Sequence, residues 1–314
     1  MPEAQLPEAQ LPEPRLPEAQ LPEAQMPETR LTVRKTYKLF IAGAFPRSES
    51  GRSYTICGSG GQVLANAALA SRKDLREAVV AARKAQPGWA KATAYLRGQV
   101  VYRVAEMLEG RHAQFVDALV TGEGLSAEDA STTVDAAIDR LVWYAGWSDK
   151  FAQVAGSSNP VAGPYFNFSI PEPTGVVGVL APQGSSLLGL VSVIAPVITT
   201  GNAVVVVASE DHPLPALELA EVLATSDLPA GVVNILTGRT AELAPVLAAH
   251  RDVDALDLAG ATPEVEAELE AAAADNVKRV LRRAPVGPDW AAEPSPARLV
   301  FFTEIKTVWH PVGV

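Results

Sequence analysis

Residues 171–238 read PEPTGVVGVLAPQGSSLLGLVSVIAPVITTGNAVVVVASEDHPLPALELAEVLATSDLPAGVVNILTG. Apolar runs rich in β-branched residues occur at 176–180, 204–207 and 232–236, and a fourth follows at 253–258. Between them lie helix-compatible stretches at 186–198, 214–225 and 241–250. Continuous apolar strands that alternate with helices are typical of a parallel sheet covered on both faces. The sequence therefore predicts an α/β fold with a Rossmann-like parallel sheet, which binds ligands at the carboxyl ends of its strands.

The sequence before this stretch predicts mostly helices. Leu75, Ala78, Val79 and Ala82 follow helical spacing and predict a helix over 72–86. A second apolar stripe runs from 96 to 119, and Ser126 with Asp129 predicts the start of a third helix. We expect further elements in four places: strands at 37–41 and 277–281, a helix at 264–274, and an extended edge strand at 165–170. The last stretch, 301–312, alternates enough to predict a strand.

Composition limits the classes of function. The chain has 314 residues, a net charge of −10 and one cysteine. The negative charge argues against a nucleic-acid partner, and one cysteine excludes an internal disulfide framework and a cysteine metal cage. Apolar runs are too short for a membrane span, and the start of the sequence lacks the features of a secretory signal. We therefore expect a cytoplasmic protein without a membrane partner.

Residues 2–30 form a pentapeptide array of the type LPEAQ, with seven prolines and six glutamates against two arginines. A proline every five residues blocks helix propagation, and one Leu or Met per repeat supplies too little core to offset the entropy of ordering. We therefore predict a disordered tail over residues 1–32. Two roles remain open: a passive, solubilising tail, which we favour, and a docking or packaging tag.

The cysteine, the histidines and the clustered aromatic residues, each considered alone, predict no catalytic, metal or nucleic-acid site. Cys57 sits beside turn glycines and reads as a small, half-buried residue rather than a nucleophile. The four histidines lack metal-ligand spacing, so no metal is predicted. Trp143, Tyr144 and Trp147 share one helical face, which favours packing over base stacking.

Four phrases within the opening stretch carry a family resemblance: Pro173-x-Gly175-Val-Val-Gly178, Ala195-Pro196, Gly201-Asn202 and Pro229-x-Gly231-Val-Val-Asn234. Their order and spacing resemble the coenzyme-binding domain of aldehyde dehydrogenases. The resemblance runs from Tyr37 to Leu281, and the closing FFTEIKTVWHPVGV resembles the family's oligomerisation strand. It implies a domain over 33–285 that binds NAD(P), then a linker and an oligomerisation strand over 286–314.

Departures from the family pattern put the cofactor in doubt. The family motif K-P-S-E, whose Lys and Glu hold the adenosine ribose, reads Val207-Ala208-Ser209-Glu210 here. The phosphate motif F-T-G-S-x-x-x-G has become Leu258-Ala259-Gly260-Ala261 followed by Val265. The resemblance leaves Ser209, Glu210 and Gly260 as vestigial cofactor contacts, so NAD(P) is expected to bind weakly if it binds at all.

The catalytic positions depart further. Gly184 stands where the family has the oxyanion Asn, and Arg283 stands where it has the base Glu. Glycine has no side-chain donor, and arginine cannot accept a proton at neutral pH. The family's catalytic domain, with its nucleophilic cysteine, is missing after Pro285, and Cys57 lies in the wrong region to replace it. No catalytic residue is assigned.

The sequences DAAIDRLVWYAGWSDKF at 135–151, VVVVASEDHPL at 204–214 and NVKRV at 276–280 resemble the degenerate, cysteine-less second half found in some long aldehyde dehydrogenases. We therefore expect a non-catalytic subunit that forms a homodimer or a hetero-oligomer with a cysteine-bearing aldehyde dehydrogenase. Two alternatives stay open. The chain is an NAD(P)-binding regulatory module, or it retains oxidoreductase activity on aldehydes with a nucleophile supplied by a partner.

Overall fold

The apolar runs at the centre of the sequence form one five-stranded parallel sheet in the computed structural model, which describes residues 33–284 and 286–313. The strand order is β10-β9-β6-β7-β8. The strands are β6 (Val176–Leu180), β7 (Ala203–Val207), β8 (Val233–Leu236), β9 (Ala255–Asp257) and β10 (Arg279–Leu281). Every residue of β6 to β9 is buried, which explains why these strands are almost continuously apolar instead of alternating; the polar exceptions are Asn234 and Asp257. The predicted parallel α/β sheet is confirmed.

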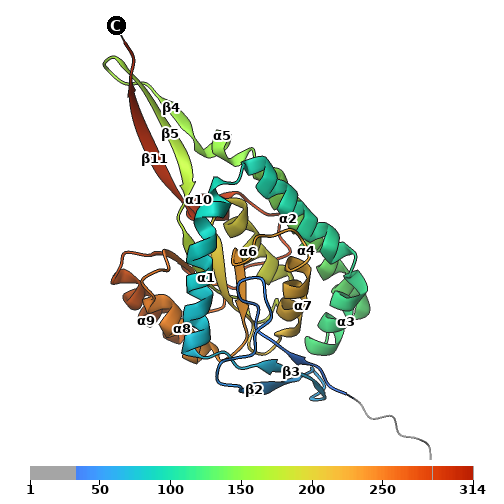
Figure 1. The fold of residues 1–314 in the computed structure, drawn as a ribbon. Helices are drawn as coiled ribbons and strands as arrows, with labels where there is room; N and C mark the ends of the chain where they lie inside the picture. The colour runs from blue at the N-terminus through green and yellow to red at the C-terminus, as the bar shows by residue number, and fades with distance from the viewer. Residues whose placement is uncertain (1–32, 285, 314) are drawn as a thin grey trace, which may run out of the picture. The chain divides into compact units, whose positions relative to one another are not determined.

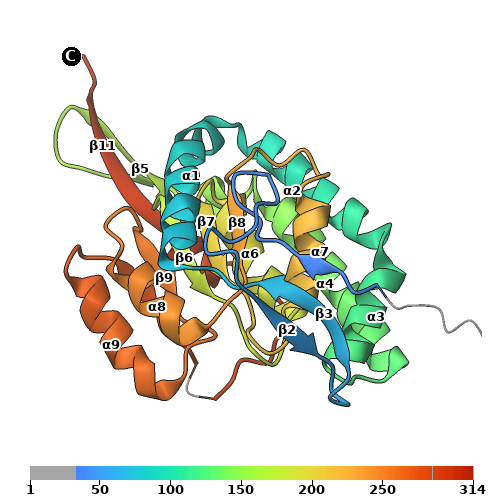
Figure 2. The same ribbon diagram turned by 60° about the horizontal axis from the view of Figure 1, so that its bottom comes forward.

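Helices cover both faces of this sheet, as Figures 1 and 2 show. One face packs on α1 (Arg72–Lys91), α8 (Thr240–Ala249) and α9 (Pro263–Ala274). The other packs on α6 (Leu188–Thr199) and α7 (Leu214–Leu223). Successive side chains of a strand point to opposite faces, so Val205 joins the first core while Val204 and Val206 join the second.

Three further helices extend the second core: α2 (Ala94–Glu109), α3 (His112–Gly122) and α4 (Ala127–Trp147). The predicted start of α4 is confirmed, since the Ser126 Oγ accepts a hydrogen bond from the Asp129 N–H at 3.0 Å. The stripe predicted over 96–119 is carried by two helices, because α2 ends at Glu109 and α3 begins at His112. Both helices bury apolar residues in the same core, so the stripe continues across the break.

Two small sheets accompany the parallel one. The first has the order β1-β3-β2 and consists of β1 (Thr36–Tyr37), β2 (Ser53–Cys57) and β3 (Val63–Ala68). The strand predicted at 37–41 is shorter than expected. Beyond Tyr37 the segment makes isolated backbone contacts instead, from Leu39 to Pro46, from Phe40 to Ile235 and from Ile41 to Ala44.

The second small sheet is antiparallel, has the order β11-β5-β4 and follows the short helix α5 (Phe151–Ala155). Its strands are β4 (Ser157–Asn159), β5 (Tyr165–Pro173) and β11 (Thr303–Pro311). The prediction of an edge strand at 165–170 is wrong, because β5 is the middle strand. The predicted C-terminal strand is confirmed, but its first residue, Phe301, belongs to the short helix α10 (Ala297–Phe301).

None of the helices in the described ranges combines the length and apolar character that a membrane crossing requires. The predicted disorder of the repeat tail, residues 1–32, falls outside the described residues.

Candidate functional site

The candidate site is the edge of the parallel sheet where its strands end. All five strands run in the same direction, so the segments that follow them meet at one edge, and parallel sheets bind ligands there. These segments begin at Ala181 after β6, Ala208 after β7, Thr237 after β8, Leu258 after β9 and Arg282 after β10. The three predicted cofactor contacts, Ser209, Glu210 and Gly260, all lie on these segments.

Ser209 and Glu210 are bound to the segment that follows β6. The Ser209 hydroxyl donates to the backbone oxygen of Gln183 at 3.0 Å, and the Glu210 N–H donates to the Gln183 side-chain Oε1 at 2.8 Å. Ser209 also accepts a hydrogen bond from the His212 N–H at 3.1 Å. Gln183 therefore ties the ends of β6 and β7 together, a role that sequence analysis did not assign to it.

Both carboxylate oxygens of Glu210 are engaged by the chain itself. Arg239 Nη1 donates to one at 2.6 Å, and the N–H of Thr240, the first residue of α8, donates to the other at 2.9 Å. The guanidinium of Arg239 also lies over the Tyr54 ring, 5.5 Å from its centroid. Glu210 thus caps a helix and holds an ion pair, so a ribose would have to share a carboxylate that already makes two contacts.

Gly260 is a packing residue in this structure. Its N–H donates to the Leu180 oxygen at 2.8 Å, and a Cβ at this position would lie 1.9 Å from the Ala181 oxygen. Only glycine permits that approach between the ends of β9 and β6. The neighbouring departures are apolar packing as well, since Ala261 is buried and Val265 packs against the same core.

The N-terminus of α9 is already supplied with negative charge. Glu264 and Glu266 occupy its first turn, where the helix dipole favours anions. Hydrogen bonding by Thr262 lowers the pKa of Glu264, so its carboxylate is ionised at neutral pH. A pyrophosphate at this helix terminus would meet two carboxylates.

The family's catalytic positions hold different chemistry. Arg283 stands in the place of the base. Its Nε lies 3.3 Å from Glu266 Oε2, and its backbone N–H donates to Glu266 Oε1 at 3.2 Å. Cys57 ends β2 in the first small sheet, and the structure shows it exposed rather than half-buried. No group of three or more His, Cys, Asp or Glu in the described ranges has a geometry suited to a metal ion.

The segment expected to be a linker packs against the sheet face that α6 covers. Leu299 and Phe302 are fully buried there, and Arg140 of α4 donates to the backbone oxygens of Trp290 and Ala292, both at 2.8 Å. Arg298 pairs with Asp257, the last residue of β9, whose carboxyl is fully buried. Burial raises the pKa of Asp257, and the Arg298 charge opposes that shift.

The β11-β5-β4 sheet presents apolar side chains to solvent. Strand β11 pairs with β5 over nine residues, and within the described ranges no strand pairs with its outer edge. Ile305 and Trp309 are 53% and 58% exposed, and Phe166 on the opposite face of the sheet is 49% exposed. Exposed apolar side chains beside an open sheet edge are typical of surfaces at which chains pair.

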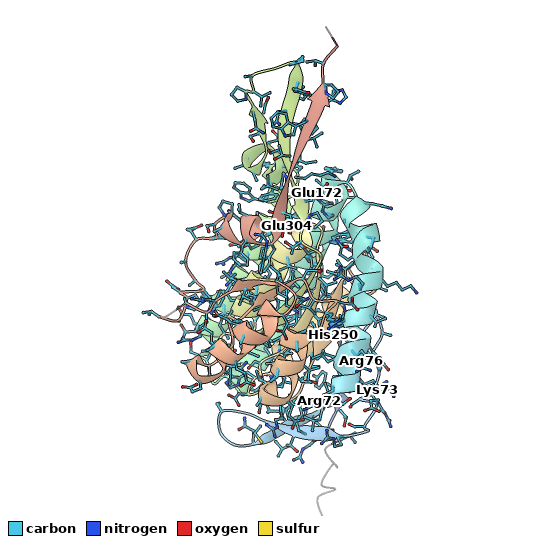
Figure 3. The ribbon with its side chains drawn as sticks, turned by 90° about the vertical axis from the view of Figure 1, so that its left-hand side faces the viewer. Arg72, Lys73, Arg76, Glu172, His250 and Glu304 are labelled. Atoms are coloured by element: carbon cyan, nitrogen blue, oxygen red, sulfur yellow. The ribbon has the colours of Figure 1, made fainter. Side chains whose placement is uncertain are left out.

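Figure 3 shows Glu172 and Glu304 where this sheet meets the rest of the fold. The two residues are directly opposite in the β5–β11 register, which would be unfavourable for like charges. Each carboxylate has its own cation, however. Lys306 lies 2.8 Å from Glu172, and Arg279 of β10 donates twice to Glu304, at 2.6 and 2.7 Å. The Arg279 pair therefore fastens the small sheet to the edge strand of the parallel sheet.

Comparison with known proteins agrees with this geometry. The family model described as "Aldehyde dehydrogenase family" matches residues 45–283. The chain is 32% identical over 261 residues to aldehyde dehydrogenase, cytosolic 1, of Elephantulus edwardii, a match that covers 80% of this chain and 50% of that protein. The chain is 34% identical over 263 residues to mouse cytosolic 10-formyltetrahydrofolate dehydrogenase, a match that covers 80% of this chain and 28% of that protein.

A solved structure supports the same relationship. The NAD+ complex of an aldehyde dehydrogenase from Bacillus cereus superposes with a TM-score of 0.73 at 26% identity, and the match covers 78% of this chain and 50% of that one. The chain thus spans about half the length of these relatives, or less. A family match over residues 45–283 and the shared fold lead to one conclusion: this chain belongs to the aldehyde dehydrogenase family.

Proposed function

We propose that this chain is a non-catalytic subunit that assembles with a second copy of itself or with a complete, cysteine-bearing aldehyde dehydrogenase. The observation that carries the proposal is the β11-β5-β4 sheet, which combines an unpaired edge with exposed Ile305 and Trp309. An exposed apolar edge strand is a liability in a monomer and a binding surface in an assembly. Pairing along β11 would satisfy its free backbone groups and bury both side chains.

The chemistry of the site supports the non-catalytic part of the proposal. Aldehyde oxidation in the family needs a thiolate, a base and an oxyanion donor. Here Cys57 lies in a different sheet, Gly184 has no side-chain donor, and an arginine, Arg283, replaces the base. Each of these losses alone removes orders of magnitude in rate.

The residues present do not fit a dinucleotide. Glu210 is held by Arg239 and Thr240, and the first turn of α9 carries two carboxylates. Val207, in the place of the family's lysine, is buried in the core. A ribose would have to share the Glu210 carboxylate with Arg239 and Thr240, and a phosphate at the start of α9 would approach the Glu264 carboxylate. We therefore propose no step that involves NAD(P).

Light scattering of the full chain tests the assembly. We expect the wild type to be a dimer or larger, and the Ile305→Lys and Trp309→Lys variants to be monomers, since a charge on an edge strand opposes pairing. The matched control is Tyr102→Lys on α2, because Tyr102 is 50% exposed and Trp309 58%. Truncation before α10 is unsuitable, since it removes the buried Leu299 and Phe302.

A second arm mixes the chain with the complete aldehyde dehydrogenase of the same organism and measures co-elution. A monodisperse wild-type monomer that does not bind this enzyme would refute the proposal. Turnover of an aldehyde by the purified chain would favour the alternative that the chain retains oxidoreductase activity. Tight binding of NAD or NADP would favour the alternative of an NAD(P)-binding regulatory module.

A further inference from the structure

A cavity of about 290 Å³ opens where β9 and β10 end. Three arginines line it, namely Arg282 and Arg283 directly after β10 and Arg298 on α10. The apolar part of its wall comes from Leu281, Pro288 and Phe301. Among the described residues no acidic side chain lines this cavity. The carboxyl ends of parallel strands, where this cavity lies, are the usual ligand position in such sheets.

Each of the three arginines is oriented by a carboxylate that lies outside the cavity wall. Arg298 pairs with Asp257, Arg283 with Glu266, and Arg282 with Glu270. Such pairs fix the direction of a guanidinium while leaving some of its five N–H groups free, because a carboxylate engages at most two of them.

Arg283 carries the clearest sign of unused binding capacity. Its Nε is buried and makes no hydrogen bond, because the nearby Glu266 oxygen at 3.3 Å is not well aligned with the N–H. Its Nη1 makes only a long bond of 3.4 Å to the Ala284 oxygen. Because the Nε is buried beside Glu266, the Nη groups of Arg283, which lines the cavity, are the donors that remain for an oxyanion there.

We propose that this cavity binds a small carboxylate with a short apolar chain. A guanidinium pairs with a carboxylate through two parallel hydrogen bonds, and the apolar wall suits an alkyl chain of a few carbons. The volume lies at the lower limit for ligand pockets, which excludes a dinucleotide. The three cations also disfavour the positively charged ring of oxidised nicotinamide. Arg283, in the place of the family's base, thus binds an anion where a proton acceptor would stand.

Calorimetric titration of the full chain with sodium butanoate, butanamide and inorganic phosphate tests the ligand class. We expect butanoate to bind at least about tenfold more tightly than butanamide, because only the charged group forms the paired bonds with arginine. Phosphate should also bind more weakly than butanoate, since it cannot use the apolar wall. Equal affinity for butanoate and butanamide, or the tightest binding by phosphate, would overturn the assignment.

Substitutions test whether butanoate binds in this cavity. Arg283→Ala should weaken butanoate binding by about tenfold or more, whereas Arg103→Ala, which removes an exposed arginine paired with Glu106 on α2, should leave it unchanged. Ala284→Leu fills the cavity from an exposed position without breaking an ion pair, so it remains informative if Arg283→Ala fails to fold. Unchanged butanoate affinity in Ala284→Leu would refute the proposed location, and loss of binding would support it. The result is independent of whether the chain assembles.

Discussion

Replacing Arg298 by alanine should destabilise the protein strongly, because it leaves the Asp257 carboxylate buried without a cation. Asp257 has no exposed side-chain surface, whereas Arg298 is 24% exposed. Breaking a buried ion pair by removing one partner typically costs about 3–5 kcal/mol in the free energy of unfolding. Because Arg298 is partly exposed, we expect about 3 kcal/mol, including a small loss from its contact with the Trp290 ring at 5.4 Å.

The cost should depend on pH in a defined direction. Burial already raises the pKa of Asp257 in the folded protein, and loss of the Arg298 charge raises it further. Between the pKa of about 3.9 expected in the unfolded chain and the raised folded pKa, the folded state binds more protons, so lower pH favours folding. The stability difference between Arg298→Ala and the wild type should therefore shrink from pH 7.5 to pH 5.

Denaturant unfolding followed by circular dichroism at both pH values measures these differences. The double variant Arg298→Ala with Asp257→Asn should be more stable than Arg298→Ala alone, since it removes the orphaned charge. Lys306→Ala is the matched control, because it breaks an exposed pair with Glu172 and should cost less than about 1 kcal/mol at either pH. A cost below about 1 kcal/mol for Arg298→Ala, or one that grows as the pH falls, would refute the reasoning.

Three other predictions concern the sheet edge. The purified chain should oxidise no aldehyde with NAD or NADP in a spectrophotometric assay, and turnover that survives Cys57→Ala and removal of host enzymes would contradict this. Calorimetry should detect no dinucleotide binding in the low micromolar range, because three lost contacts, at Val207, Ala261 and Val265, of about 1–2 kcal/mol each weaken affinity by two or more decades. Glu210→Ala should lower the free energy of unfolding by about 1 kcal/mol through loss of the α8 cap, and an unchanged denaturation midpoint would contradict it.

The parallel sheet could be predicted because its strands are buried on both faces and therefore read as continuous apolar runs. The predicted strand at 176–180 coincides with β6 for this reason. The starts of α4 and α9 also carry local signals: Ser126 caps α4, and Pro263 lies in the first turn of α9. Such features depend on neighbours in the sequence, so the sequence alone reveals them.

Other features depend on partners far along the chain. The middle position of β5 is set by β11, and α10 is too short to show helical periodicity although it buries Leu299. At the site, the family resemblance identified Ser209, Glu210 and Gly260 as cofactor contacts, and the structure places all three at one sheet edge. Sequence analysis could not predict that Gln183 and Arg239 bind the first two, because neither contact has a signature in spacing.

The pairing of β5 with β11 has a consequence for how the protein folds during synthesis. Ser169 and Thr307 share a hydrogen bond across the two strands although 138 residues separate them. The Phe302 oxygen, just before β11, accepts hydrogen bonds from Asn202 and Thr174. Contacts of such long sequence separation form late, because the entropy of closing the loop must be overcome first. The core around the parallel sheet therefore stays incomplete until Leu299 and Phe302 have been synthesised, so exposure to chaperones and proteases should persist until this segment has left the ribosome.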